Sequence, residues 1–216
     1  MNFESGYLYH IYNQGNNRVK IFYSQENYLF FLEKIKKHFT PFVDILAWCL
    51  MPNHFHLLVY IYDTKNSSDL QTEKSKSFNS NNSEPSASFS LNQSIGIMLR
   101  SYTRAINLQQ NRSGSLFREA TKAICLNANS QLAKSWYLNQ GVTMINHVES
   151  EKQYPNICYN YILFNPVKDG LVKHSEDWEF SSYRDVIGLR NGKLINRERI
   201  NSFALEVNPE LMGYAF

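Results

Sequence analysis

The sequence predicts an α+β domain whose helices pack on a mostly antiparallel sheet. The order of its segments is the first observation that predicts this class: a strand, a helix, two strands, a helix, a further strand and then helices follow along the chain. The second is the Pro52-Asn53 turn, which joins two strand-like runs as a hairpin. A hydrophobic fraction of 43% supplies enough apolar side chains for a core.

The first strand is predicted over residues 7–13, which are rich in aromatic and β-branched side chains. Residues 14–18 follow it as a turn-forming cluster. Ser24 is the expected N-cap of a helix from about residue 25 to residue 38. The apolar residues of that helix recur at helical spacing: Tyr28, Phe31, Leu32 and Ile35.

The second strand is predicted over residues 42–50, and the third runs on from the Pro-Asn turn. Because side chains alternate between the two faces of a strand, His54 and His56 share one face, while Phe55 and Leu57 share the other and can enter a core. Two imidazoles at this spacing are close enough to bind one divalent metal ion and leave positions open for other ligands. The alternative is a pair of hydrogen-bonded histidines at a strand end.

Residues 64–93 are dominated by Ser and Asn and predict a flexible insertion, because so polar a stretch buries little apolar surface. Helical spacing resumes after it, and a broken fourth strand is expected over 116–118 and 123–126. A helix is then expected over 130–148, followed by a short helix over about 156–164. The resumed helical spacing is carried by Ile95, Met98, Leu99, Tyr102 and Ile106.

Proline is expected to interrupt the last helix on both sides, at Tyr154-Pro155 and at Pro166, because it lacks an amide donor. Trp178, Phe180 and Tyr183 are expected to pack down a final short segment. We therefore predict one domain over residues 1–190, with the insertion at about 64–93, and a C-terminal tail over 191–216. A ferredoxin-like layout fits this order of elements best.

The composition indicates which kinds of partner and which cellular compartment suit the protein. The net charge of +3 is mildly basic and compatible with a nucleic-acid partner. Cys49, Cys125 and Cys158 are an odd, scattered set, which fits a reducing cytoplasm and argues against a disulfide framework. No signal peptide is recognised, and no apolar run approaches the ~20 residues needed to span a bilayer.

Tyr161 and Asn165 are the second candidate pair, because residues four apart are neighbours on one helical face. A phenol beside a carboxamide can serve as a nucleophile and a metal ligand. Taken alone, this pair is a weak signal, because a tyrosine in such a segment is more often a core or surface aromatic.

Four blocks of the chain resemble the single-tyrosine HUH transposases, most closely the group of REP-associated tyrosine transposases. Two blocks are specific: residues 49–59 (CLMPNHFHLLV), with the His-hydrophobe-His signature, and residues 161–172 (YILFNPVKDGLV), trailed by 177–184 (DWEFSSYR). Residues 9–18 (YHIYNQGNNR) and 114–118 (GSLFR) support them. The blocks run in the family's order.

The resemblance implies a ferredoxin-like fold with the histidine strand at its centre. It implies that Tyr161 is the catalytic tyrosine and that His54, His56 and Asn165 hold Mg²⁺ or Mn²⁺. The implied reaction cleaves and rejoins single-stranded DNA beside a hairpin through a 5′-phosphotyrosine. Tyr159 is the fallback nucleophile. A bacterial, nucleoid-associated protein is implied, as a homodimer or a monomer.

Phosphate contacts are expected from basic residues near the predicted strands and on the helix after the insertion. These are Arg18, Arg100, Arg104, Arg118, Lys122 and Lys168. Tyr9, Tyr12 and Tyr60 are expected to stack on unpaired bases. Two alternatives stay open: a catalytically inactive protein that binds structured single strands, and a metal hydrolase acting on another substrate.

Overall fold

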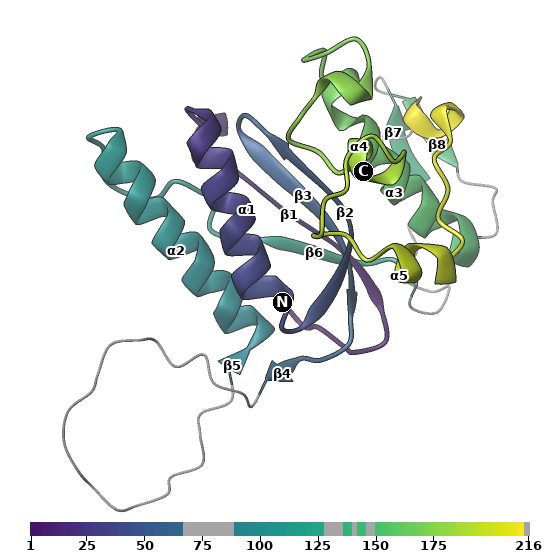
Figure 1. Cartoon of the computed structure of the whole chain (residues 1–216), viewed down its shortest axis with the longest axis horizontal. Helices are drawn as coiled ribbons and strands as arrows, with labels where there is room; N and C mark the ends of the chain where they lie inside the picture. The colour runs from purple at the N-terminus through teal and green to yellow at the C-terminus, as the bar shows by residue number, and fades with distance from the viewer. Residues whose placement is uncertain (67–88, 128–135, 140–141, 146–149, 214–216) are drawn as a thin grey trace, which may run out of the picture.

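The computed structural model describes residues 1–66, 89–127, 136–139, 142–145 and 150–213 (Figure 1). Its centre is a four-stranded antiparallel sheet in the order β2-β3-β1-β6. The strands are β1 (Leu8–Gln14), β2 (Val43–Met51), β3 (His54–Ile61) and β6 (Lys122–Cys125). The helix α1 (Gln25–Phe39) follows β1, and α2 (Leu91–Gln109) follows β3. This is the ferredoxin-like arrangement, with the histidine strand inside the sheet, and the predicted fold class is confirmed.

The helices α1 and α2 cover one face of the sheet (Figure 1). Phe31 of α1 packs against Phe55 of β3 with the ring centroids 5.1 Å apart, and Tyr102 of α2 packs on Phe31 at 4.8 Å. Phe55, Leu57 and the other apolar residues on this face of β3 are fully buried. Burial of each such side chain stabilises the fold by roughly 1.5–3 kcal/mol, so this layer holds the sheet and both helices together.

The helix α3 (Ser150–Lys168) lies against the opposite face, over β2 and β3. It is longer than predicted: the expected break at Pro155 and the expected stop or kink at Pro166 both fall inside it. A proline inside a helix costs roughly 3 kcal/mol, which sequence reasoning treats as an end. Here the apolar side of α3 is buried against the sheet, and this packing keeps the segment helical through both prolines.

The helix expected over residues 130–148 is wrong wherever the chain is described. The strands β7 (Trp136–Asn139) and β8 (Val142–Ile145) pair antiparallel instead. Their aromatic and β-branched residues favour strand, and Gly141 weakens a helix between them in the sequence. The rest of the expected helix, at residues 130–135, 140–141 and 146–148, lies outside the described residues.

Most of the predicted insertion, residues 67–88, also lies outside the described residues. Its two ends meet, because β4 (Lys65–Asn66) pairs with β5 (Phe89–Ser90). The helix α2 begins at Leu91, two residues before the expected end of the insertion. A capping box explains this start: the Ser90 hydroxyl accepts a hydrogen bond from the Gln93 amide at 3.3 Å, and the Gln93 side chain accepts one from the Ser90 amide at 2.9 Å.

The chain after α3 covers the edge of β2. Its elements are η2 (Ser175–Asp177), α4 (Tyr183–Val186), α5 (Arg197–Ser202) and η3 (Pro209–Gly213). The Leu50 amide donates to the Phe180 carbonyl at 2.9 Å, and the Asn196 amide donates to the Ile45 carbonyl at 2.8 Å. The predicted packing of this segment is confirmed, since the Phe180 ring stacks on Tyr28 at 3.9 Å. These contacts remove an exposed strand edge.

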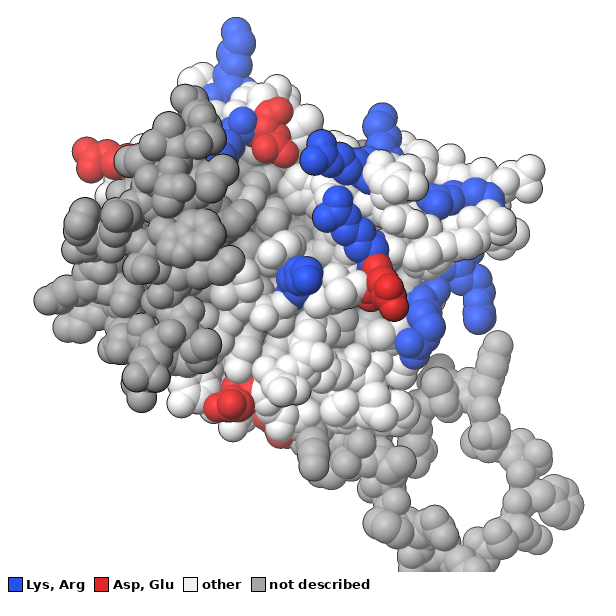
Figure 2. Space-filling view, turned by 180° about the vertical axis from the view of Figure 1, so that it is seen from behind, with Lys and Arg blue, Asp and Glu red and all other residues white. Residues whose placement is uncertain are grey.

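The chain carries a formal net charge of +3. Figure 2 shows Lys and Arg side chains gathered over one part of the molecule seen from behind, with fewer acidic side chains among them. Within the part of the chain that the structure describes, no helix combines the length and apolar character needed to cross a bilayer.

Candidate functional site

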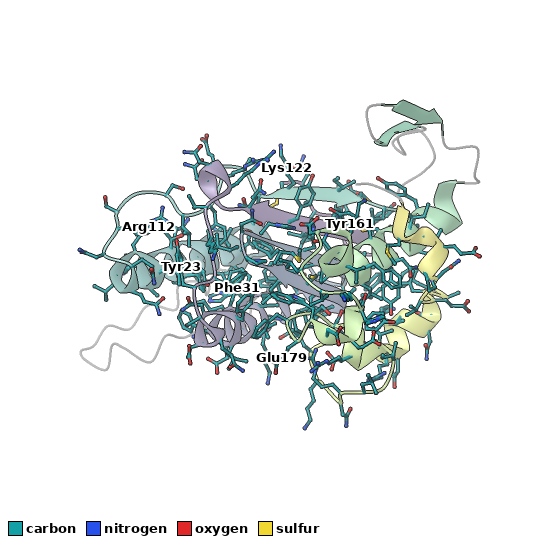
Figure 3. The ribbon with its side chains drawn as sticks, turned by 90° about the horizontal axis from the view of Figure 1, so that it is seen from above. Tyr23, Phe31, Arg112, Lys122, Tyr161 and Glu179 are labelled. Carbon is teal, nitrogen blue, oxygen red and sulfur yellow. The ribbon has the colours of Figure 1, made fainter. Side chains whose placement is uncertain are left out.

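Strand pairing sets out one row of side chains across the face that α3 covers. His56 of β3 lies opposite Tyr12 of β1, and Tyr12 lies opposite Lys122 of β6. The helix α3 places Tyr161 over this row, with its ring centroid 5.3 Å from that of His56 (Figure 3). The phenol and the imidazole, 105 positions apart in the numbering, are therefore neighbours only because α3 docks on the sheet.

Asn165 lies one helical turn after Tyr161 and faces the other histidine. Its Oδ1 atom is 3.3 Å from His54 Nε2, and the His54 and His56 ring centroids are 5.0 Å apart. The structure thus brings the four predicted residues into one cluster. A hollow of about 290 Å³ opens beside them. Its lining residues are Tyr12, Asn13, Gln14, His54, His56, Arg118, Ala120, Lys122 and Tyr161.

Burial keeps both histidines neutral. It lowers the pKa of His54, an effect partly opposed by the hydrogen bond to Asn165 and by Asp169. Burial also lowers the pKa of His56 well below its usual value, and the neighbouring His10 and His54 add to this effect. Neutral imidazole is the form that binds metals, because it has a free lone pair on one nitrogen.

The residues present fit a divalent cation. His56 Nε2 is buried and has no hydrogen-bond partner in the described part of the chain. Two imidazole nitrogens and a carboxamide oxygen form a usable donor set for a divalent metal. Among the described residues, no group of three His, Cys, Asp or Glu side chains is arranged to hold a metal. The predicted set therefore differs from such a group, because its third member is the carboxamide of Asn165, whose Oδ1 lies 3.3 Å from His54 Nε2.

Tyr161 is protonated near neutral pH. Burial raises the pKa of Tyr161 to about 12, with a smaller contribution from Asp169, and the hydrogen bond to the Asn165 side chain acts in the opposite direction. Lys168 Nζ lies 5.2 Å from the centre of the Tyr161 ring. A phenol in this state needs further positive charge nearby before it can act as a nucleophile.

Tyr159, the fallback nucleophile, points elsewhere. It is fully buried and does not line the hollow. Two positions along a helix are a rotation of about 200°, so α3 cannot turn Tyr159 and Tyr161 toward the same histidines. Of the two tyrosines, Tyr161 is the one beside the cluster.

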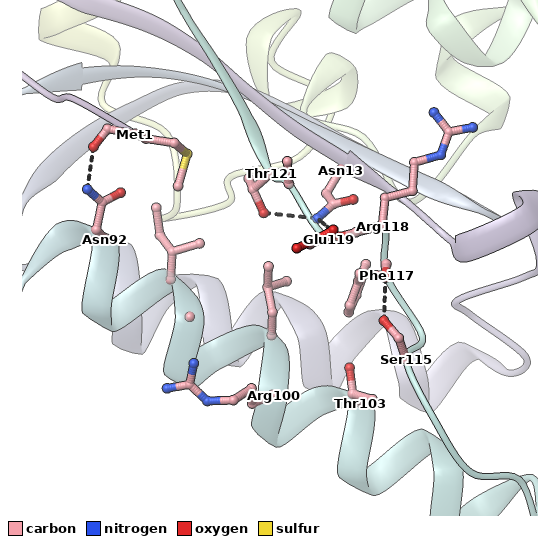
Figure 4. Close-up of a pocket in the computed structure, with 14 residues that line it drawn as sticks. Met1, Asn13, Asn92, Arg100, Thr103, Ser115, Phe117, Arg118, Glu119 and Thr121 are labelled. Atoms are coloured by element: carbon pink, nitrogen blue, oxygen red, sulfur yellow. Dashed lines mark hydrogen bonds between the residues drawn. The ribbon is translucent and has the colours of Figure 1, made fainter.

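The six basic residues expected to contact DNA separate into three groups. Arg118 and Lys122 line the hollow, and Lys168 lies over Tyr161. Arg100 lines a second hollow of about 550 Å³ between α2 and the segment before β6 (Figure 4). The two hollows share Asn13, Arg118 and Ala120, so they adjoin. Arg18 and Arg104 are exposed but line neither hollow.

Of the three tyrosines expected to stack on bases, Tyr12 alone lines one of these two hollows. Tyr9 is 5% exposed and packs edge-on against Phe3. Tyr60 lies beneath Arg199, whose guanidinium is 4.1 Å from the ring centre. Tyr9 and Tyr60 therefore have their rings covered by other parts of the chain.

Sequence reasoning missed two residues behind the histidines. His10 Nε2 is 2.9 Å from His56 Nδ1, and Asn53 Oδ1 is 2.6 Å from His54 Nδ1. Asn53 stands next to the histidine motif in the sequence, where its only predicted role is in the Pro52-Asn53 turn. His10 shares a face with Tyr12, but its position beside His56 depends on how β1 pairs with β3.

Comparison with solved structures finds a similar fold in a REP-associated tyrosine transposase bound to a REP hairpin. The identity is 15%, the match covers 91% of this chain and 95% of that chain, and the TM-score is 0.50. At this identity the likeness shows the fold alone and supports at most a distant relationship. No family model matches the chain, and no curated protein matches it.

Proposed function

We propose that this protein is a transposase-like enzyme that cleaves and rejoins single-stranded DNA beside a hairpin, with Tyr161 as the nucleophile. The observation that carries the proposal is the cluster of Tyr161, Asn165, His54 and His56, formed from two elements distant in the sequence. Tyr161 and both histidines also line one hollow. The similar solved structure, a tyrosine transposase bound to a hairpin, supports the class of substrate.

In this proposal His54 and His56 hold Mg²⁺ or Mn²⁺ through their Nε2 atoms, and Asn165 holds it through Oδ1. When bound, the ion supplies a Lewis acid that stabilises charge on the phosphate. The protein supplies neutral imidazoles at neutral pH and a fixed distance between its ligands. Lys168, beside the Tyr161 ring, adds positive charge that favours the phenolate.

The reaction is a transesterification. The Tyr161 oxygen forms a bond to phosphorus while the bond between phosphorus and the 3′ oxygen of the preceding nucleotide breaks. The phenol proton passes to solvent, and the departing 3′ oxygen takes up a proton and leaves as a hydroxyl. The product is a 5′-phosphotyrosine with a free 3′-hydroxyl. A second 3′-hydroxyl can reverse the same exchange and rejoin the strand.

The two adjoining hollows give single-stranded DNA a path along the protein. Arg118 and Lys122 border the first hollow, where they can contact phosphates on either side of the bond that is cut. Arg118 also borders the second hollow, which continues the path toward Arg100 (Figure 4). Contacts of this kind bind the backbone without reading its sequence and weaken as salt increases.

The experiment is a covalent-adduct assay with an oligonucleotide that carries a hairpin and a single-stranded flank. With Mn²⁺, the wild type is expected to form an adduct that carries the 5′-phosphate, and Tyr161→Phe is expected to form none. Tyr23→Phe makes the same chemical change at an exposed tyrosine well away from Tyr161 and should retain the adduct (Figure 3). An adduct that survives Tyr161→Phe would remove Tyr161 from the mechanism.

A second candidate function is a non-catalytic protein that binds structured single strands. The observation that favours it is the partial burial of Tyr161, which raises its pKa to about 12 and works against nucleophilic attack. The same assay separates the two functions. Equal hairpin binding by the wild type and Tyr161→Phe, with no adduct from either protein, would establish the binding function and exclude the enzyme.

A further inference from the structure

Each histidine of the cluster has a hydrogen-bond partner on its Nδ1 side and presents Nε2 to the cluster. His54 Nδ1 is 2.6 Å from Asn53 Oδ1, and His56 Nδ1 is 2.9 Å from His10 Nε2. His54 Nε2 faces Asn165, and His56 Nε2 is buried without a hydrogen-bond partner among the described residues. The two partners come from different places, the β2–β3 turn and the neighbouring strand, yet they act on the same ring nitrogen.

The Asn53 contact determines which nitrogen of His54 carries the proton. The Asn53 amide nitrogen donates to the Arg18 carbonyl at 3.4 Å, which orients Oδ1 toward His54. A carboxamide oxygen only accepts hydrogen bonds, so His54 must carry its proton on Nδ1 and a lone pair on Nε2. That lone pair faces the Asn165 side chain at 3.3 Å, where a cation can be shared between the nitrogen and the carboxamide oxygen.

The backbone around Asn53 is held in place by the segment after β1. The Gly15 amide donates to the Asn53 carbonyl at 2.7 Å, and the Ile21 amide donates to the Pro52 carbonyl at 2.8 Å. Gly15 has no room for a side chain, since a Cβ there would lie 2.1 Å from the Val19 carbonyl oxygen. This segment therefore fixes the turn, and through the turn it fixes the direction of the Asn53 side chain.

His10 has the corresponding place behind His56. It is 1% exposed, and its ring is stacked on the His56 ring with the centroids 5.0 Å apart. At 2.9 Å, one proton lies between His10 Nε2 and His56 Nδ1. If His56 donates it, His56 Nε2 keeps a lone pair that points at the cluster.

We propose that Asn53 and His10 are positioning residues that hold His54 and His56 as Nδ1–H tautomers, so that both Nε2 lone pairs are aimed at one cation. The inference rests on the proposed function, because that function gives the reason for a cation site. It concerns the free protein, before any DNA binds. Partners of this kind orient metal-binding histidines and typically change metal affinity by about 10–100-fold.

The first test is nitrogen-15 NMR of histidine side chains in the full-length protein without metal or DNA. The wild type is expected to show His54 and His56 as Nδ1–H tautomers. In Asn53→Leu, His54 should shift toward the Nε2–H form, because its acceptor is gone. Asn53→Asp keeps an acceptor oxygen in the same place and should restore the wild-type signals. A wild-type spectrum with His54 or His56 protonated at Nε2 overturns the proposal.

The second test is Mn²⁺ binding, followed by electron paramagnetic resonance. Asn53→Leu and His10→Leu should each weaken Mn²⁺ binding by about 10–100-fold, and Asn53→Asp and His10→Gln should recover most of it, since each conservative variant can still accept from Nδ1–H. Asn201→Leu and His174→Gln, at exposed positions, are matched controls that should bind as the wild type does. Unchanged Mn²⁺ binding in folded Asn53→Leu overturns the proposal. If His10→Leu does not fold, the Asn53 variants alone decide the proposal.

These tests are separate from the test of catalysis. The expected tautomers and Mn²⁺ affinities without any adduct would leave the positioning roles standing and remove the enzymatic function. If the wild type forms the adduct while its His56 is an Nε2–H tautomer, the enzymatic function would stand and the positioning roles would be removed.

Discussion

Both faces of β3 are covered by helices, but they differ in what their burial achieves. On the face toward α1 and α2, Phe55 and Leu57 are fully buried in an all-apolar layer. On the face toward α3, His56 is buried with one ring nitrogen that has no hydrogen-bond partner among the described residues. Burial of apolar surface stabilises a fold, whereas burial of an unpartnered polar atom costs stability.

The difference shows how one strand separates structure from chemistry. Because side chains alternate, a substitution at Phe55 or Leu57 should act on stability, and one at His54 or His56 should act on the site. Substitutions of Asn53 and His10 should also act on the site, because their hydrogen bonds orient the two imidazoles.

The largest effect is expected on the apolar face. Phe55→Ala removes a fully buried ring between Phe31 and Phe117 and should lower the free energy of unfolding by about 3–5 kcal/mol. Urea denaturation followed by circular dichroism measures the change. A loss below about 1 kcal/mol would mean that this layer is not the main stabilising core.

The next effect is expected on the histidine face. His56→Ala should reduce the yield of the covalent adduct by at least about 100-fold, because loss of a partner behind a ligand alone costs about 10–100-fold. The variant should stay folded, as judged by its circular dichroism spectrum. Full adduct formation by His56→Ala would show that the imidazole is not a ligand, and the two faces would then differ in polarity but not in role.

Acid should destabilise the protein through the buried histidines. Burial lowers the pKa of His10 to about 3, from an unfolded value of 6.5. The unfolded chain therefore binds the proton first, so the stability present above pH 6.5 is lost as the pH falls toward 3. For His10 alone the loss should reach about 2 kcal/mol at pH 5.

Urea midpoints between pH 7 and pH 5 measure this loss. His10→Gln, which has no group that titrates in this range, should show a smaller decline than the wild type by about 2 kcal/mol. The same decline in both proteins would contradict a neutral, buried His10.

The smallest effects are expected at the rim of the hollows. Arg118→Ala and Lys122→Ala should each weaken binding of a single strand by a few fold and reduce the salt dependence by about 0.7 in log-log slope. Arg104→Ala removes an equal charge from an exposed position outside both hollows and should change binding less. Fluorescence anisotropy over a salt series measures both quantities. An equal loss in all three variants would indicate a diffuse charge effect without a defined route.

Much of the fold could be predicted because its signals are local. Alternation along β3 and helical spacing along α1 and α2 are properties of short segments, and they determined the class of fold. The errors came where tertiary packing overrode a local rule. Proline predicted both ends of the helix that carries Tyr161, yet burial of its apolar side against the sheet extends α3 past Pro155 and Pro166.

The candidate site divides in the same way. The sequence by itself determined each pair: His54 with His56 by the two-residue repeat of a strand, and Tyr161 with Asn165 by the turn of a helix. Only the tertiary structure decided that the two pairs meet, and that His10 lies behind one imidazole with Asn53 behind the other. The reason is physical: strand register and helix docking depend on contacts between residues far apart in the chain, which no local repeat encodes.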